Sequence, residues 1–237
     1  MTDPPCGRAN CPVVDPTPER LRRLRTTVLS SGTRLRRGHA TAQPDPTELV
    51  PGLGNTRFAP LVGAAHTYVA VTSVAALLES AFHSAAPPAP RIAVASLRRW
   101  SESQVVTTQD LRLVDLRDSQ LSRLGVSRDQ LVATAPAHYP CTRRWASALH
   151  RRAVGGHPAH GLMWESRQAE ATTAALTVRP AVRELMGTAP SDVAVIWAPP
   201  AATGILAAGD AGLGPLDRGE GLTFVLDLAA ALNIVVH

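Results

Sequence analysis

The chain has 237 residues, of which 45% are hydrophobic, and this is enough to bury the core of one domain that carries additional segments. No apolar run approaches the roughly 20 residues that a membrane helix needs. The N-terminal residues also lack the charged start and apolar stretch of a secretion signal, so we expect a cytoplasmic protein.

The formal net charge of +5 comes from arginine, because the chain contains no lysine. Arginines cluster at residues 20–25, 34–37 and 143–152. Guanidinium groups bind the oxyanions of phosphates, in nucleic acids or in nucleotides. None of the few aromatic residues interleaves with a basic run, as a base-stacking platform requires. We therefore do not expect the chain to bind nucleic acid on its own.

Cysteine usage argues against both a disulfide framework and a metal. The chain has three cysteines, Cys6, Cys11 and Cys141, and an odd number does not suggest a set of disulfides. Cys6 and Cys11 lie in residues 1–17, where prolines and weak apolar periodicity predict a disordered leader. Because no second cysteine or histidine pair stands at zinc-ligand spacing, we expect no metal site.

Residues 18–237 are predicted to form a single domain, which begins with an amphipathic helix. Leucines among arginines over residues 19–29 predict this first helix, and residues 33–37 predict a strand. A proline-containing loop over residues 40–54 follows. The β-branched alternation over residues 67–72 predicts another strand, and Thr72 or Ser73 can cap a helix to about residue 84 that contains Glu79.

The rest of the chain alternates between short strands and short helices. Strands or buried runs are predicted at residues 91–97, 111–116, 193–198, 222–227 and 232–236. Helices are predicted at residues 127–131, 143–154 and 179–186, a strand or turn at 164–167, and mostly loop at 204–221. No strand leads into a glycine-rich phosphate turn, which excludes a Rossmann unit. We predict an α+β fold with a central, mostly antiparallel mixed sheet and flanking helices.

Five segments carry the functional signal of the sequence. In chain order they are Thr33-Arg34-Leu35, Gly54-Asn55-Thr56-Arg57-Phe58-Ala59-Pro60, Tyr68-Val69-Ala70, Ala76-Leu77-Leu78-Glu79 and Gly161-Leu162-Met163-Trp164-Glu165-Ser166-Arg167. In order and spacing they resemble the RES domain family over residues 33–170, with a C-terminal extension at 171–237. The family is named for an arginine, a glutamate and a serine, which correspond here to Arg57, Glu79 and Ser166.

The resemblance implies a toxin-like enzyme that destroys NAD+, with a fold similar to that of ADP-ribosyltransferase toxins. It also implies that an antitoxin protein often caps the active site. NAD+ would be the substrate, and no further cofactor is expected. This chain departs from the family in its longer leader, in its C-terminal extension, and in having Gly54 where some members have a tyrosine.

The site residues take their expected roles from this resemblance. Breaking the nicotinamide–ribose bond produces a ribosyl cation that resembles an oxocarbenium ion. Glu79 would stabilise this cation or bind a hydroxyl of the ribose. Arg57 would clamp a phosphate or position Glu79. Tyr68 would stack on nicotinamide while its hydroxyl binds the sugar. Ser166 would bind a phosphate or receive the nucleotide, and Arg34 would line the same pocket.

The sequence leaves the acceptor of the ribosyl group open. Water would make the chain a glycohydrolase, and inorganic phosphate would make it a phosphorylase. One alternative is an ADP-ribosyltransferase that modifies a macromolecule, with the loop at residues 38–56 recognising the acceptor. Another is a non-catalytic basic binding module, in which Glu79 is structural and binding weakens steeply with salt.

Overall fold

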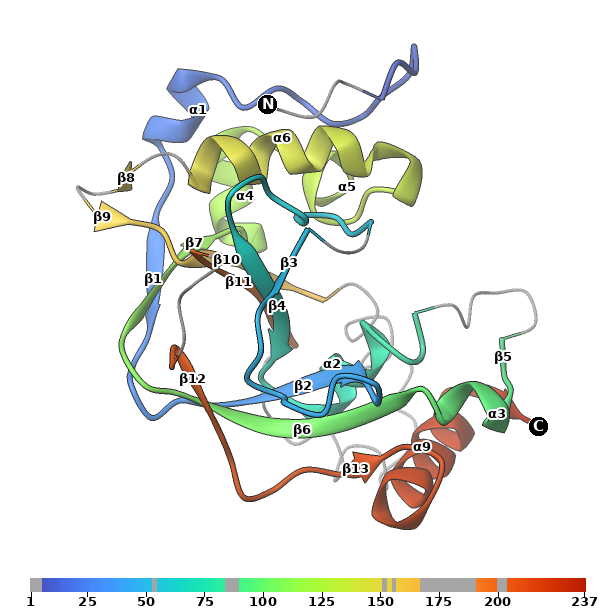
Figure 1. Cartoon of the computed structure of the whole chain (residues 1–237). Coiled ribbons are helices and arrows are strands. Elements are labelled where there is room, and N and C mark those ends of the chain that lie inside the picture. Colours follow the sequence, from blue (N-terminus) through green and yellow to red (C-terminus); the bar gives the residue numbers. More distant parts are fainter. Residues whose placement is uncertain are drawn as a thin grey trace.

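The structure is a computed structural model that describes residues 6–52, 55–83, 90–150, 153–154, 157–166, 191–199 and 204–237. Its centre is a ten-stranded sheet that curls around part of the core (Figure 1). Helices pack above this sheet and beside its lower end. A membrane-crossing helix would need a length and hydropathy that no helix in the described residues has.

The sheet is almost entirely antiparallel. Its strand order is β1-β7-β10-β11-β4-β2-β6-β12, with β13 added to β6 and β3 added to β4. The strands are β1 (Thr26–Leu29), β2 (Arg34–Ala40), β3 (Val50–Pro51), β4 (Ala65–Ala70), β6 (Trp100–Thr107), β7 (Leu111–Asp115), β10 (Gly161–Glu165), β11 (Asp192–Ala198), β12 (Leu206–Ala208) and β13 (Gly214–Pro215). Only the β10–β7 pair is parallel among these described strands, which confirms the predicted α+β class.

Two small strand pairs and a set of short helices complete the described fold. β5 (Arg91–Ile92) pairs in parallel with β14 (Val235–Val236), and β8 (Ala153–Val154) pairs with β9 (His157–Pro158). The helices are α1 (Pro18–Arg22), α2 (Ser73–Leu78), α3 (Val94–Leu97), α4 (Asp118–Leu124), α5 (Arg128–Leu131), the 3₁₀ helix η1 (Pro136–His138), α6 (Tyr139–His150) and α9 (Gly219–Ala231). Figure 1 shows α4, α5 and α6 stacked at one end and α9 at the other.

The sheet separates two hydrophobic cores. Successive side chains of a strand point to opposite faces, and β11 follows this rule while being buried on both faces. Val193, Val195 and Trp197 join the larger core with α2, α6 and α9. Ala194 and Ile196 join a smaller core inside the curl of the sheet. The strands β4 and β10 divide their side chains in the same way, so each presents one face to the helices.

The helix α2 begins as predicted but ends earlier. Thr72 caps it, because its Oγ1 accepts a hydrogen bond of 3.1 Å from the amide of Ala75. The prediction of a helix to residue 84 is wrong, because α2 stops at Leu78 and Glu79 is its C-cap residue. Ser80 Oγ then donates to the carbonyl of Ala76 at 2.6 Å. A side chain at Gly38 of β2 would collide with Ser80 Oγ, so glycine allows β2 to approach the end of α2.

Other element predictions also differ from the structure, and one long strand was missed. Residues 26–29 form β1 rather than the end of a helix, because the β-branched Thr-Thr-Val run pairs with β7. The run at 222–227 lies inside α9, since a short apolar run does not distinguish a helix from a strand. Residues 94–97 are helical as well. The strand β6 was not predicted, because it contains Glu102 and Gln104, which are polar residues that are buried in the structure.

The predicted disordered leader is described from Cys6 onward, and it lies along α6 (Figure 1). Trp145 Nε1 donates to the carbonyl of Val14 at 2.6 Å, and Arg144 pairs with Asp15 at 2.9 Å. Both tryptophan and arginine belong to α6. The predicted helix at 179–186 lies outside the described residues.

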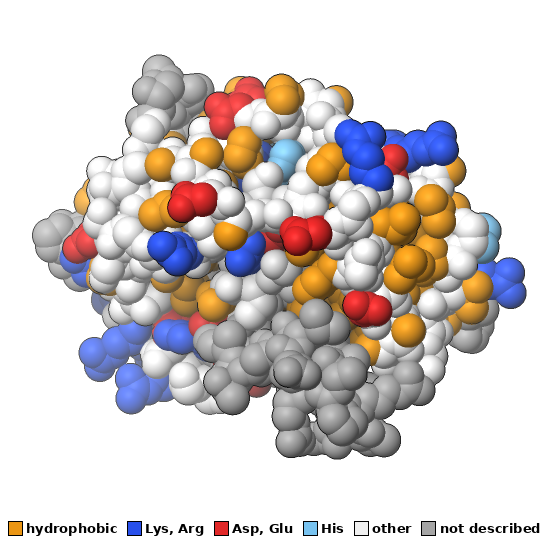
Figure 2. Space-filling view, turned by 90° about the horizontal axis from the view of Figure 1, so that it is seen from below, with side chains coloured by type: hydrophobic (Ala, Val, Ile, Leu, Met, Phe, Trp, Pro, Cys, Tyr) orange, Lys and Arg blue, Asp and Glu red, His pale blue; other side chains and the backbone are white. Residues whose placement is uncertain are grey.

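Figure 2 shows the molecule from below, with acidic and basic side chains interspersed over this face. No continuous basic stripe crosses its described part. Hydrophobic side chains gather on the side where α9 lies. Leu226 of α9 and Val235 of β14 are exposed hydrophobic residues. This face therefore does not have the one-sided positive charge that is typical of nucleic-acid binding.

Candidate active site

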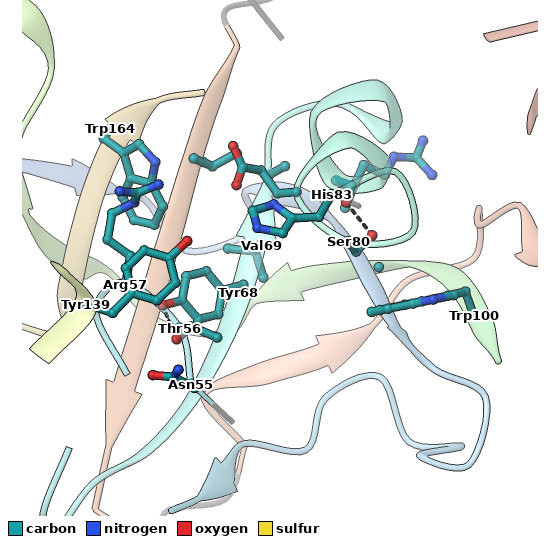
Figure 3. Close-up of a pocket in the computed structure, with 16 residues that line it drawn as sticks. Asn55, Thr56, Arg57, Tyr68, Val69, Ser80, His83, Trp100, Tyr139 and Trp164 are labelled. Atoms are coloured by element: carbon teal, nitrogen blue, oxygen red, sulfur yellow. Dashed lines mark hydrogen bonds between the residues drawn. The ribbon is translucent and has the colours of Figure 1, made fainter. Parts of the chain in front are cut away.

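A cavity of about 290 Å³ opens between the end of α2, the strands β2 and β4, and the start of α6. Three of the five predicted site residues line it, namely Arg57, Tyr68 and Glu79. Figure 3 shows Arg57, Tyr68, Tyr139 and Trp164 grouped at one end, with Trp100 at the other end and His83 between. The described part of the cavity therefore has aromatic rings at both ends.

Arg57 is held in place by its neighbours on three sides. Its Nη1 donates to both the carbonyl and the hydroxyl of Thr134, at 2.7 Å each. Its guanidinium carbon lies 5.1 Å from the centre of the Tyr139 ring, in cation–π geometry. Its own carbonyl accepts a hydrogen bond from Thr142 Oγ1 of α6. The side chain is thus fixed at the cavity wall, where it can meet an anion.

Tyr68 stabilises the same turn through its hydroxyl. This hydroxyl accepts from the amide of Phe58 at 3.2 Å and lies 2.7 Å from Thr56 Oγ1. Because Thr56 Oγ1 gives its proton to the carbonyl of Ala59, the tyrosine hydroxyl donates to Thr56. Burial raises the pKa of Tyr68 to about 12, so the hydroxyl is protonated at neutral pH. The ring, rather than the engaged hydroxyl predicted to bind the sugar, is the part that faces a ligand.

Glu79 lies at the end of α2 and lines the same cavity. Its Oε1 accepts a hydrogen bond of 2.6 Å from Ser166 Oγ. Ser166 is completely buried and directly follows β10, whereas Glu79 is half-buried and reaches the cavity. The serine is therefore placed behind the glutamate and orients its carboxylate. This position differs from the predicted one, in which Ser166 itself binds a phosphate.

The structure does not bring Arg34 into the cavity. Arg34 is exposed at the start of β2, and the arginine that lines the cavity is Arg36, two residues further along. Arg36 Nη1 donates to the carbonyl of Ala211 at 2.6 Å and lies 3.7 Å from Glu102 Oε1. Glu102 is fully buried and also accepts from the hydroxyl of Ser73 at 2.9 Å. A buried carboxylate thus holds the second cationic group of the site.

Sequence reasoning missed the aromatic side chains around Arg57. Trp164 packs edge-to-face on Phe58 at 5.1 Å and on Tyr68 at 6.1 Å between ring centres. Its place two residues before Ser166 on a strand was a usable signal, because alternate residues share a face. Tyr139 had no such signal, since only the folding of α6 brings it to Arg57. His83 stands four residues after Glu79 and lines the cavity, although it was not predicted as a site residue.

This arrangement combines two arginines, an oriented carboxylate and several aromatic faces around one cavity. Arginines bind anions, the carboxylate stabilises a developing positive charge, and aromatic faces stack on planar rings. Such a cavity suits a ligand that has both a phosphate and an aromatic ring. Its volume is near the lower end of the range of about 300–1,000 Å³ for small-molecule sites.

Comparison with known proteins agrees with the fold and the order of the motifs. A chain in the crystal structure of the M. tuberculosis MbcT–MbcA toxin–antitoxin complex is similar in fold, with a TM-score of 0.50 and 13% sequence identity. The alignment covers 90% of this chain and 96% of that chain. No curated protein matches the sequence significantly. The RES domain profile matches residues 33–197, past the predicted limit at residue 170 and through most of β11. The chain therefore belongs to the RES domain family.

Proposed function

We propose that the chain cleaves the bond between nicotinamide and ribose in NAD+. The observation that carries this proposal is the carboxylate of Glu79, which a fully buried serine orients at the wall of a cavity that also contains Arg57. A carboxylate in a fixed position can stabilise positive charge as it develops on the ribose. The cavity volume of about 290 Å³ fits the reacting end of a dinucleotide better than the whole molecule.

Each side chain of the cavity has a role in this reaction. Arg57 and Arg36 bind the pyrophosphate, because both are held rigidly and carry several N–H donors. The ring of Tyr68 packs against the nicotinamide. As the bond between C1″ of the ribose and N1 of the nicotinamide breaks, its electron pair leaves with the nicotinamide, and Glu79 stabilises the ribosyl cation. Ser166 keeps the carboxylate in position throughout.

The cation is then captured by an oxygen nucleophile. Water gives ADP-ribose and a proton, so the chain would be a glycohydrolase. Inorganic phosphate gives ADP-ribose 1″-phosphate, so the chain would be a phosphorylase. Transfer to a protein or nucleic acid is the third outcome, and the assay below distinguishes all three.

The test is the release of nicotinamide from NAD+, followed by chromatography with and without inorganic phosphate. The variant Glu79→Gln keeps the size of the side chain and removes its charge, so we expect nicotinamide release to fall by about 100-fold or more. Glu220→Gln on the exposed surface of α9 is the matched control and should keep full activity. Labelled NAD+ mixed with cell extract reports transfer to macromolecules. If the folded wild-type protein releases no nicotinamide in any buffer, the proposal is wrong.

We also propose that the chain is a toxin that works in the cytoplasm and is inhibited by an antitoxin protein that covers this cavity. Support comes from family membership and from the toxin–antitoxin complex that contains the similar chain. Expression of the wild-type chain should arrest growth of a bacterial host, whereas Glu79→Gln should not. If both proteins arrest growth equally, the toxicity has another source.

A further inference from the structure

All three cysteines of the chain meet at one place, although they are far apart in the sequence. The sulfur atoms of Cys6, Cys11 and Cys141 lie within 4.8 Å of one another. Cys11 Sγ is 3.7 Å from Cys141 Sγ, and Cys6 Sγ is 3.5 Å from Nδ1 of His138. Three sulfur atoms thus meet between the N-terminal segment and the start of α6, and the imidazole of His138 contacts one of them.

The spacing matches a tetrahedral zinc site. Zinc binds cysteine sulfur at about 2.3 Å and histidine nitrogen at about 2.0–2.1 Å, which places tetrahedral ligands about 3.8 Å apart for two sulfurs and about 3.6 Å for sulfur and nitrogen. The measured separations of 3.7 and 3.5 Å agree with these values. The remaining sulfur pairs lie below 4.8 Å, so they need only a small inward movement.

A backbone amide donates to one sulfur of the cluster. The amide of Cys6 donates to Cys141 Sγ at 3.3 Å. Gly7, the next residue, has φ +67°, which glycine adopts without steric cost. The amide of Cys11 donates to the carbonyl of Arg8 at 3.3 Å and closes the loop between the two N-terminal cysteines. Hydrogen bonds to ligand atoms are a usual part of metal sites.

We propose that Cys6, Cys11, His138 and Cys141 together bind one structural zinc ion. Four protein ligands close the coordination sphere, and sulfur-rich sets select zinc over magnesium or calcium. Binding replaces the thiol protons, which pass to solvent. This proposal replaces the expectation that the chain has no metal, which considered the ligand spacing along the sequence alone.

The ion would join the N-terminal segment to the helix that supports the cavity. His138 and Cys141 flank Tyr139, whose ring contacts the guanidinium of Arg57. Zinc at this position fixes the boundary between η1 and α6, and so fixes Tyr139. The proposal does not depend on what the cavity binds, because its test measures the metal.

The first experiment measures zinc by elemental analysis in the chain of residues 1–237 purified without chelator. We expect about one zinc per chain. Cys11→Ser and His138→Ala should each lower the content below about one tenth, and His237→Ala, an exposed histidine at the C-terminus, should leave it unchanged. Chelator should lower the melting temperature of the wild-type protein and leave that of the His138→Ala variant unchanged.

A second experiment needs no variant and is independent of how variants fold. Wild-type protein is stripped of metal and refilled with Co²⁺ alone, and a tetrahedral thiolate site should give sulfur-to-cobalt charge-transfer bands. Absence of both zinc and these bands would overturn the proposal. A mass two hydrogens lower than the sequence requires would instead identify a disulfide, and zinc that persists in both variants would place the ion elsewhere.

Discussion

The two walls of the cavity are built differently. Arg57 and its turn are fixed by Thr134, by Thr142 and by the hydroxyl of Tyr68, so several contacts hold this turn and its side chain. Glu79 lies just past the end of a short helix, and one hydrogen bond from Ser166 orients its carboxylate. We infer that the arginine wall provides a rigid binding surface, whereas among the described residues the glutamate carboxylate is oriented by the hydroxyl of Ser166.

The largest expected effect, beyond that of Glu79 itself, comes from changing the arginine wall. Arg57→Lys keeps the charge but loses Nη1, which donates twice to Thr134, and the planar group that lies over the ring of Tyr139. We expect kcat/KM for nicotinamide release to fall about 100-fold. Arg112→Lys, on a strand away from the cavity, is the control. A variant with near wild-type kcat/KM would show that only the charge at position 57 matters.

A smaller and more selective effect is expected on the glutamate wall. Ser166→Ala removes the donor that orients the carboxylate, so kcat should fall about tenfold while KM changes less than about threefold. The matched control is Ser96→Ala, which loses a partly buried hydrogen bond of 2.7 Å from its hydroxyl to the carbonyl of Ala93. Equal rises in KM and losses of stability in the two variants would mean that Ser166 is only structural.

The smallest effect concerns the protonation of Tyr68. Its pKa in the folded chain is about 12, against about 10 in an unfolded chain, so the folded state keeps the proton up to a higher pH. The resulting stability is complete below pH 10 and is lost as the pH rises from 10 to 12. Tyr68→Phe cannot titrate, so the difference in free energy of unfolding between wild type and this variant isolates the effect. A difference that stays constant from pH 9 to 12 contradicts the assignment.

The sequence predicted local features better than features that depend on distant parts of the chain. The strand β4, the cap at Thr72 and the short helix α5 follow from neighbouring residues, and all three are confirmed. The identities of Arg57 and Glu79 as cavity residues came from the spacing of family motifs. Tyr139 could not be predicted in this way, because its contact with Arg57 joins residues that are far apart in the chain.

Buried polar residues account for other failures. The strand β6 was not predicted, because Glu102 and Gln104 interrupt its apolar pattern. The burial of Glu102 depends on Ser73 and Arg36, which lie in other elements. The choice of Arg34 over Arg36 failed because both lie on the same face of β2, and only the shape of the cavity decides which one it reaches. The cysteine cluster was missed for a similar reason, because its members are brought together by α6.

The order of the strands also determines when the cavity can exist during protein synthesis. Tyr68 and Glu79 are made early, but β4 has β11 as its neighbour, and the serine that orients Glu79 follows β10. A ribosome must therefore extend the chain past residue 198 before the walls of the cavity are complete. A nascent chain that is released before residue 198 therefore lacks the finished cavity.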